Sequence, residues 1–326
     1  MTRLLQYPTW RSSMYDTLNN YPPNSARQSI IGICFLIFST LFISACGGTM
    51  NIKNIFNAED EITVKDIEFS EVYWFAQRAK GAYATEQQIK TDFPQTILVK
   101  TLTDIDVQYF VEEFNERKLQ VISVRGTSNF KNALQDIEYM QVNDNELGIF
   151  VHKGFNHTAI KVYADLQSIL KKDYQIAVTG HSLGAAIATL VMMHLHSDGY
   201  ELSPSINFGQ PKVTNHKGVS RFKTLPVMRV VNKEDVVPMV PPVTVLDSVH
   251  GIYQHLGEEI ILLPDSYFVY QDQHDASRLS IGSFWRNLGH ERVEDHYMDQ
   301  YLTNIEPKLI RAEQISYADR EQFVTN

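Results

Sequence analysis

One segment near the middle of the chain constrains the fold more than any other. An apolar run at 176–179 leads directly into Gly180-His181-Ser182-Leu183-Gly184, and an alanine-rich apolar stretch continues to about residue 195 without Gly or Pro. This order predicts a strand, a tight G-x-S-x-G turn and a helix. The two glycines remove β-carbons that would collide where the strand and helix backbones nearly touch.

Such a turn presents the Ser182 hydroxyl at a helix N-terminus. Backbone N–H groups and the helix dipole favour negative charge at that position. Ser182 is therefore predicted to be a nucleophile, the alternative being an ordinary Gly-Ser turn.

Asp235 is the best-placed acid after Ser182. A nucleophilic serine on this kind of turn is followed in the chain by its acid and then by its histidine. The strand-like run 227–231 precedes Asp235, and α/β sheets gather their chemistry just beyond the carboxyl ends of strands. Pro238 then begins a proline-rich loop that stops any helix. The other candidate acids lie in turn-like polar stretches or next to His296: Asp247, Asp265, Asp272, Asp275 and Asp295.

The residues alone leave the choice of base open. His296 stands at the start of a predicted C-terminal helix, from which a base can reach over the turn that carries Ser182. His255 precedes the apolar run 260–263 and fits a structural histidine near the start of a strand. The remaining candidates lie in polar, turn-rich stretches typical of the surface: His250, His274 and His290.

The composition restricts the class of protein. A chain of 326 residues can hold one large α/β domain with a full core. Its 44% hydrophobic and 21% charged residues are typical of a globular protein. The net charge of −9 and the lack of a basic stripe argue against nucleic-acid binding. No Cys/His cluster has metal-ligand spacing, since His194 and His196 face different sides of a helix, so we expect no metal.

Further motifs accompany the serine motif in a fixed order. They are Val151-His152-Lys153-Gly154-Phe155, Asn207-Phe208-Gly209-Gln210-Pro211-Lys212-Val213, Asn232-x-x-Asp235-x-Val237-Pro238, Tyr253-x-His255-x-Gly257-x-Glu259, and Asp295-His296 followed by Tyr301. Each motif alone is modest, but the ordered set resembles the class 3 lipases, the fungal triacylglycerol lipase type. The resemblance covers roughly residues 67–305.

This resemblance implies an α/β-hydrolase fold with a mostly parallel central sheet and helices on both faces. It also implies that Ser182 is the nucleophile, Asp235 the orienting acid and His296 the base. His255 then belongs to a structural strand motif, and His181 is a packing residue.

An oxyanion hole needs one N–H from the residue after the nucleophile, here Leu183, and another from the loop after an earlier strand. The run 119–124 predicts that strand, and in the class 3 pattern Thr127 supplies the second donor. Residues 128–140 have apolar side chains at helical spacing and resemble the lid of the family, although a surface helix packed on the core fits equally well. Asp136 then corresponds to a lid carboxylate that orients the Thr127 hydroxyl.

The N-terminus carries a second informative pattern. An apolar run at 30–45 follows three scattered arginines and is shorter than the roughly 20 residues of a spanning helix. Ile43-Ser44-Ala45-Cys46-Gly47 closes it and resembles the lipobox of bacterial lipoproteins, in which Cys46 is lipidated and becomes the mature N-terminus. The alternative is a retained membrane anchor.

These patterns predict three parts: a signal sequence at 1–45, a lipidated Cys46 with a tether at 46–65, and a hydrolase domain at 66–326. The domain is expected to begin with a helix from about 66 to 88. Its predicted location is the bacterial cell envelope, at the outer membrane in a Gram-negative cell.

The sequence thus predicts a lipid-anchored enzyme that hydrolyses carboxylic esters of lipids without a cofactor. His296 takes the proton of Ser182 as Ser182 attacks the ester carbonyl, Asp235 steadies the imidazolium, and water releases the acyl group. A phospholipase A1 or a small-ester esterase would use the same residues. A catalytically inactive hydrolase fold serving as an envelope-anchored binding module is a further alternative, against which the intact set of catalytic candidates argues.

Overall fold

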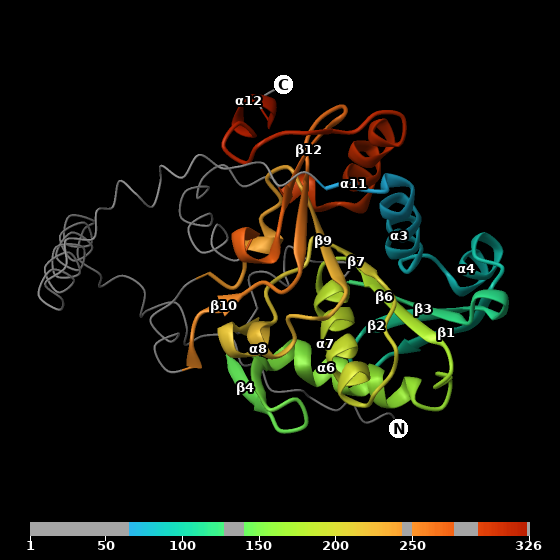
Figure 1. Ribbon diagram of the computed structural model, residues 1–326. Coiled ribbons are helices and arrows are strands. Elements are labelled where there is room, and N and C mark those ends of the chain that lie inside the picture. The colour runs from blue at the N-terminus through green and yellow to red at the C-terminus, as the bar shows by residue number, and fades with distance from the viewer. Residues whose placement is uncertain (1–64, 127–139, 243–249, 277–292, 325–326) are drawn as a thin grey trace, which may run out of the picture. The chain divides into compact units, whose positions relative to one another are not determined.

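The computed structural model describes residues 65–126, 140–242, 250–276 and 293–324 (Figure 1). A large sheet has a four-stranded part in the order β1-β2-β3-β6 and a five-stranded part in the order β13-β12-β11-β9-β7. The strands are β1 (Thr96–Leu102), β2 (Val107–Phe114), β3 (Leu119–Val124), β6 (Gln175–Gly180), β7 (Ser205–Phe208), β9 (Val227–Asn232), β11 (Glu258–Leu262), β12 (Tyr267–Gln271) and β13 (Glu313–Gln314).

The two parts of the sheet meet between β6 and β7. Parallel bridges pair Ile176 with Leu202 and His181 with Phe208, and the Ser182 N–H donates to the Phe208 carbonyl over 3.0 Å. The central pairs β3/β6, β7/β9 and β9/β11 are parallel, whereas β1/β2, β2/β3 and β11/β12 are antiparallel. The predicted parallel centre is confirmed, with antiparallel strands toward both edges.

Helices cover both faces of this sheet, as predicted. On one face α6 (Lys153–Leu166) packs on α7 (Leu183–Ser197), which lies against β3 and β6. On the other, α3 (Phe69–Gly81) packs on α11 (Met298–Ile305), and Figure 1 shows this pair side by side. Side chains of β3 alternate between the two cores: Ile122 joins the α6–α7 side and Val121 the α3–α11 side. This alternation is what a strand buried on both faces requires.

A smaller antiparallel sheet, which the sequence did not predict, has the strand order β10-β8-β5-β4. Its strands are β4 (Gln141–Asp144), β5 (Ile149–His152), β8 (Thr214–Asn215) and β10 (Tyr253–Gln254). The remaining helical segments are α4 (Glu86–Asp92), α8 (His216–Arg221), α12 (Glu321–Val324), η1 (Asn115–Arg117), η2 (Val237–Met239), η3 (Val293–His296) and η4 (Glu306–Leu309).

The single helix expected from about 66 to 88 is wrong. The chain forms α3, which ends at Gly81, and then turns before α4. A β-carbon on Gly81 would lie 2.3 Å from the Phe93 ring, so the chain passes this ring closely before it turns. Thr85 caps α4 by accepting the Gln88 N–H, and this cap ends the turn. None of the helices in the described ranges is long and apolar enough to cross a membrane.

Candidate active site

Ser182 lies on a strained turn between the end of β6 and the start of α7. Its backbone has φ 59° and ψ −129°, a conformation that is uncommon for residues other than glycine. A β-carbon on Gly180 would lie 2.5 Å from the Gly184 carbonyl, and one on Gly184 would lie 2.3 Å from the Val124 oxygen. Both glycines are therefore needed because the backbones of β6, α7 and β3 approach closely, which confirms the predicted reason for them.

Asp235 and His296 come together from distant parts of the chain. Asp235 follows the carboxyl end of β9, and His296 is the last residue of η3. The His296 Nδ1 lies 2.8 Å from the Asp235 Oδ2, and both side chains are fully buried. Because a carboxylate only accepts, Nδ1 carries the proton and Nε2 is the ring atom able to take one.

Two further donors hold the Asp235 carboxylate. The Val237 N–H donates to Oδ1 over 2.9 Å, and the Tyr301 hydroxyl donates to Oδ2 over 2.5 Å. Burial acts to raise the pKa of Asp235, but the neighbouring His296 and these hydrogen bonds outweigh it and lower the pKa below its ordinary value. The carboxylate is therefore ionised, as an acid that orients a histidine must be.

Gly209 lies between this pair and the elbow, the tight turn at residues 180–184 that carries Ser182. It follows Phe208, whose carbonyl binds the Ser182 N–H, and it has a positive φ of 55°. A β-carbon at this position would lie 2.8 Å from the His296 Cε1 and 3.0 Å from the Asp235 Oδ2. Only glycine leaves room for the histidine–acid pair beside the end of β7.

The predicted oxyanion donors fall partly within the described structure. Leu183 is the first residue of α7, where backbone N–H groups have no partner within the helix. Gly126 follows β3, and a β-carbon on it would lie 3.1 Å from the Ser182 Cβ, so this loop lies against the elbow. Thr127, Asp136 and the predicted lid up to residue 139 lie outside the described residues, as does Cys46.

The other candidate histidines and acids lie elsewhere or have structural roles. His255 is buried between β10 and β11, and its Nε2 donates to the Pro238 carbonyl over 2.7 Å. It thus supports the loop that follows Asp235. His250 stacks on Phe150. Asp247 and His290 lie outside the described residues.

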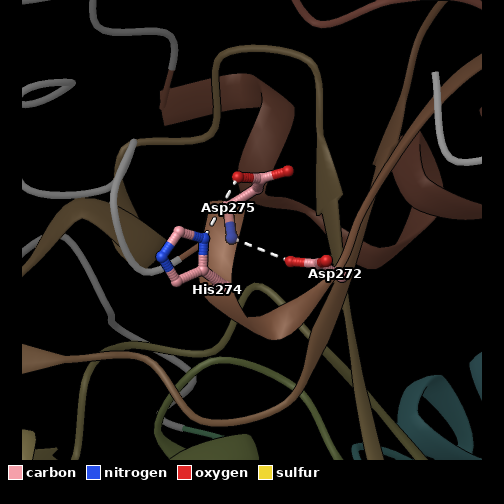
Figure 2. Close-up of side chains that lie close together, drawn as sticks. All are labelled: Asp272, His274 and Asp275. Carbon is pink, nitrogen blue, oxygen red and sulfur yellow. Dashed lines mark hydrogen bonds and ion pairs between the residues drawn. The ribbon is translucent and has the colours of Figure 1, made fainter. Parts of the chain in front are cut away.

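Asp272, His274 and Asp275 form a small cluster after β12 that the sequence did not single out (Figure 2). Their potential ligand atoms lie within 4.8 Å of one another. Asp272 accepts the Asp275 N–H over 2.9 Å and caps the turn, and the His274 Nδ1 lies 3.4 Å from the Asp275 Oδ1 on an exposed surface. These contacts describe a capped surface turn.

Comparison with known proteins shows that the chain is similar to lipases. Residues 121–245 match the family described as Lipase (class 3). The class 3 lipase match contains Ser182 and Asp235, whereas His296 lies beyond it. Among curated proteins, the chain is 31% identical over 168 residues to a lipase of Rhizopus niveus and 30% identical over 184 residues to one of Rhizomucor miehei. These alignments cover 46% and 52% of this chain but 42% and 49% of the relatives, so the chain spans less than half of their length.

Solved lipase structures share the fold. The lipase of Rhizopus microsporus var. chinensis superposes with a TM-score of 0.56 at 25% identity, over 73% of this chain and 89% of that one. Rhizomucor miehei triacylglyceride lipase gives a TM-score of 0.53 at 22% identity, over 76% of this chain and 98% of that one. The described sheet and its two helical layers are thus those of an α/β-hydrolase, as predicted.

Proposed function

We propose that this protein hydrolyses carboxylic esters of lipids through an acyl-enzyme on Ser182. The observation that carries the proposal is the fully buried hydrogen bond between His296 and Asp235, beside a serine held on a strained strand-to-helix turn. A buried acid, a histidine in a fixed tautomer and an adjacent serine are the parts that serine acyl transfer needs.

In the proposed reaction, His296 Nε2 accepts the Ser182 proton as the Ser182 oxygen bonds to the ester carbonyl carbon. Asp235 stabilises the resulting imidazolium. The Leu183 N–H, with Thr127 as the proposed second donor, binds the oxyanion of the tetrahedral intermediate. His296 then gives its proton to the leaving alcohol, and water, activated by the same ring, releases the acid.

The substrate class is proposed from the relatives. The chain is 31% identical over 166 residues to the secreted mono- and diacylglycerol lipase 1 of Fusarium solani. A second candidate, phospholipase A1 activity, is favoured by 36% identity over 83 residues to Phospholipase A1-II 1 of Oryza sativa subsp. indica. A panel of p-nitrophenyl esters, triacylglycerols and phospholipids distinguishes the two candidates from a small-ester esterase.

The nucleophile is tested with a fluorophosphonate probe and two substitutions. The probe should label the wild type but not Ser182→Ala. Ser182→Ala and His296→Ala should each lower kcat by about 10⁴–10⁶, and the double variant should be little worse because the pair acts as a unit. An unlabelled, inactive wild type would favour the binding-module alternative. A folded His255→Ala protein without activity, beside an active His296→Ala, would show that the base is assigned wrongly.

We further propose that Cys46 is lipidated and anchors the protein in a bacterial cell envelope. The support is the lipobox-like sequence that ends the N-terminal apolar run. Metabolic labelling with a fatty acid tests it: the wild type should take up label, and Cys46→Ser should remain an unlabelled precursor. Label that persists in Cys46→Ser, or is absent from the wild type, would contradict this location.

A further inference from the structure

A half-buried tyrosine, Tyr83, and a buried histidine, His181, form a chain of hydrogen bonds beside the proposed site. The Tyr83 hydroxyl lies 2.9 Å from the His181 Nδ1, and the His181 Nε2 lies 2.7 Å from the His296 backbone oxygen. A carbonyl oxygen only accepts, so the His181 proton is on Nε2 and Nδ1 accepts the Tyr83 proton. Burial raises the pKa of the Tyr83 hydroxyl, and the neighbouring Gly126 backbone acts to lower it.

This chain joins three parts of the site that are far apart in sequence. Tyr83 stands in the turn after α3, His181 immediately precedes the nucleophile, and Gly126 begins the loop beside the elbow. The three are tightly packed: a β-carbon on Gly126 would lie 2.4 Å from the Tyr83 hydroxyl and 2.5 Å from the His181 oxygen. A shift of any one of them is therefore transmitted to the others.

The loop that carries the base is held at two successive carbonyls. His181 donates to the carbonyl of His296, and the Asn232 side chain donates to that of Asp295 over 2.8 Å. The backbone on both sides of this peptide is thus fixed by side chains from β9 and from the elbow. The position of the His296 ring depends on both donors.

The charge of His181 also matters for the reaction. Its ring lies against that of His296, with 4.4 Å between centroids, and Tyr301 faces it edge-on. Burial, together with the charge of His296, lowers the pKa of His181 to about 3, against the opposing attraction of Asp235. The ring is therefore neutral when positive charge develops on His296, and the Tyr83 proton occupies the nitrogen that would otherwise take a proton.

We propose that Tyr83 and His181 are positioning residues that fix the His296 backbone, the elbow and the Gly126 turn relative to one another. They do so while keeping a neutral ring against the base. The inference rests on the proposed ester hydrolysis at Ser182. Neither residue is assigned a contact with the substrate, so their effect is expected in kcat more than in KM.

The test uses Tyr83→Phe, His181→Phe and the double variant, assayed on a soluble p-nitrophenyl ester. Rates are expressed per site titrated with the fluorophosphonate, so unfolded protein does not count. Each single variant should lower kcat about 10–100-fold, the range expected for misplacement of a catalytic group by roughly 1 Å. The kcat of the double variant should be no lower than that of the less active single variant, because both substitutions break the same chain of hydrogen bonds.

Tyr109→Phe is the matched control. It also deletes a buried tyrosine hydroxyl bond, to Asp165, but this tyrosine is on β2 in the core beneath α6 and α7. It should lower the melting temperature while kcat per titrated site stays at the wild-type value.

The split between kcat and KM supplies a readout that a purely structural role would leave unchanged. In Tyr83→Phe and His181→Phe the loss per titrated site should fall on kcat, with KM close to the wild-type value, whereas Tyr109→Phe should change neither constant.

A Tyr83→Phe protein with wild-type kcat per titrated site would overturn the inference and leave the proposed function intact. So would losses in the two single variants that add in the double variant. A wild-type protein without ester hydrolysis would overturn the proposed function and the inference together.

Discussion

The elbow can form only because glycines stand at the positions where a β-carbon would collide with the neighbouring backbone. Ser182 adopts an unfavourable backbone conformation, which costs on the order of 1–3 kcal/mol and persists only where the surroundings hold it. Gly180→Ala would place a carbon 2.5 Å from the Gly184 backbone, which belongs to α7 and cannot move without moving the helix. We expect this variant to lose fluorophosphonate labelling and to melt at a clearly lower temperature.

Gly154→Ala provides the comparison for this substitution. Gly154 is in α6, and an added β-carbon would come no closer than 3.6 Å to the His152 ring, an ordinary contact. Because alanine is favoured over glycine in a helix by up to about 1 kcal/mol, this variant should be as stable as the wild type or more stable. If Gly180→Ala behaved like Gly154→Ala, close backbone approach would not be the reason for the glycine.

The Asp235 carboxylate gives a graded prediction. Asp235→Asn turns an acceptor toward His296 into an amide that favours the wrong tautomer, and in a comparable triad this change lowers kcat on the order of 10⁴-fold. Tyr301→Phe removes one of the three hydrogen bonds to the carboxylate but leaves its charge, so its loss of kcat should be much smaller. Steady-state kinetics on one soluble ester checks the order, and equal losses in the two variants would contradict it.

At the scale of elements, His152 at the start of α6 makes the stability of the fold depend on pH. Its Nδ1 caps the helix by accepting the Phe155 N–H over 3.3 Å, and burial lowers its pKa to about 4. The unfolded chain takes up this proton near pH 6.5, before the folded protein does. The free energy of unfolding should therefore fall as pH falls from about 6.5 to 4, by up to about 1.4 kcal/mol per pH unit for this group.

His152→Asn tests this dependence, because asparagine is also a good N-cap acceptor but does not titrate. Urea unfolding at pH 7 and pH 4.5 should show a smaller loss of stability in this variant than in the wild type. Part of the slope should remain, since the pKa of His181 is also lowered, to about 3.

The same elements show what the sequence can predict. The β6–elbow–α7 unit and the strands β3, β9 and β11 were predicted because each has a local pattern: an apolar run ended by glycine or by a polar turn. The break between α3 and α4 was missed because the apolar pattern was followed through the turn, although Gly81 at the end of α3 and the Thr85 cap of α4 are local signals.

Polar partners that are far apart in the chain could not be predicted from the sequence, because no local pattern marks them. Arg229 lies in the apolar run of β9, yet it is fully buried and paired with Glu259 of β11 over 2.7 Å. Tyr83 is 98 positions from His181, and nothing near it marks it as part of the site. Asp235 and His296 were named in advance only because chain order and the resemblance to class 3 lipases reduced the choices. Their contact itself is a property of the assembled sheet.

At the scale of the whole molecule, the chain divides into two compact units with a boundary after residue 59. Residues 60–326 form one compact unit. Lys65 pairs with Glu258 at the start of β11, while Asp235 follows the carboxyl end of the parallel neighbour β9. Lys65, the first described residue, thus lies at the end of these strands opposite to Asp235.

A variant that begins at residue 60 should therefore keep the melting temperature of the wild-type domain and its kcat on a soluble ester. The lipobox-like segment would matter for location only, so hydrolysis of lipid in bacterial membranes should fall while hydrolysis of the dissolved ester does not. Thermal unfolding and both assays, run on the lipidated and the shortened protein, check this. A shortened protein that folds but loses kcat on the soluble ester would show that the extension takes part in the active site.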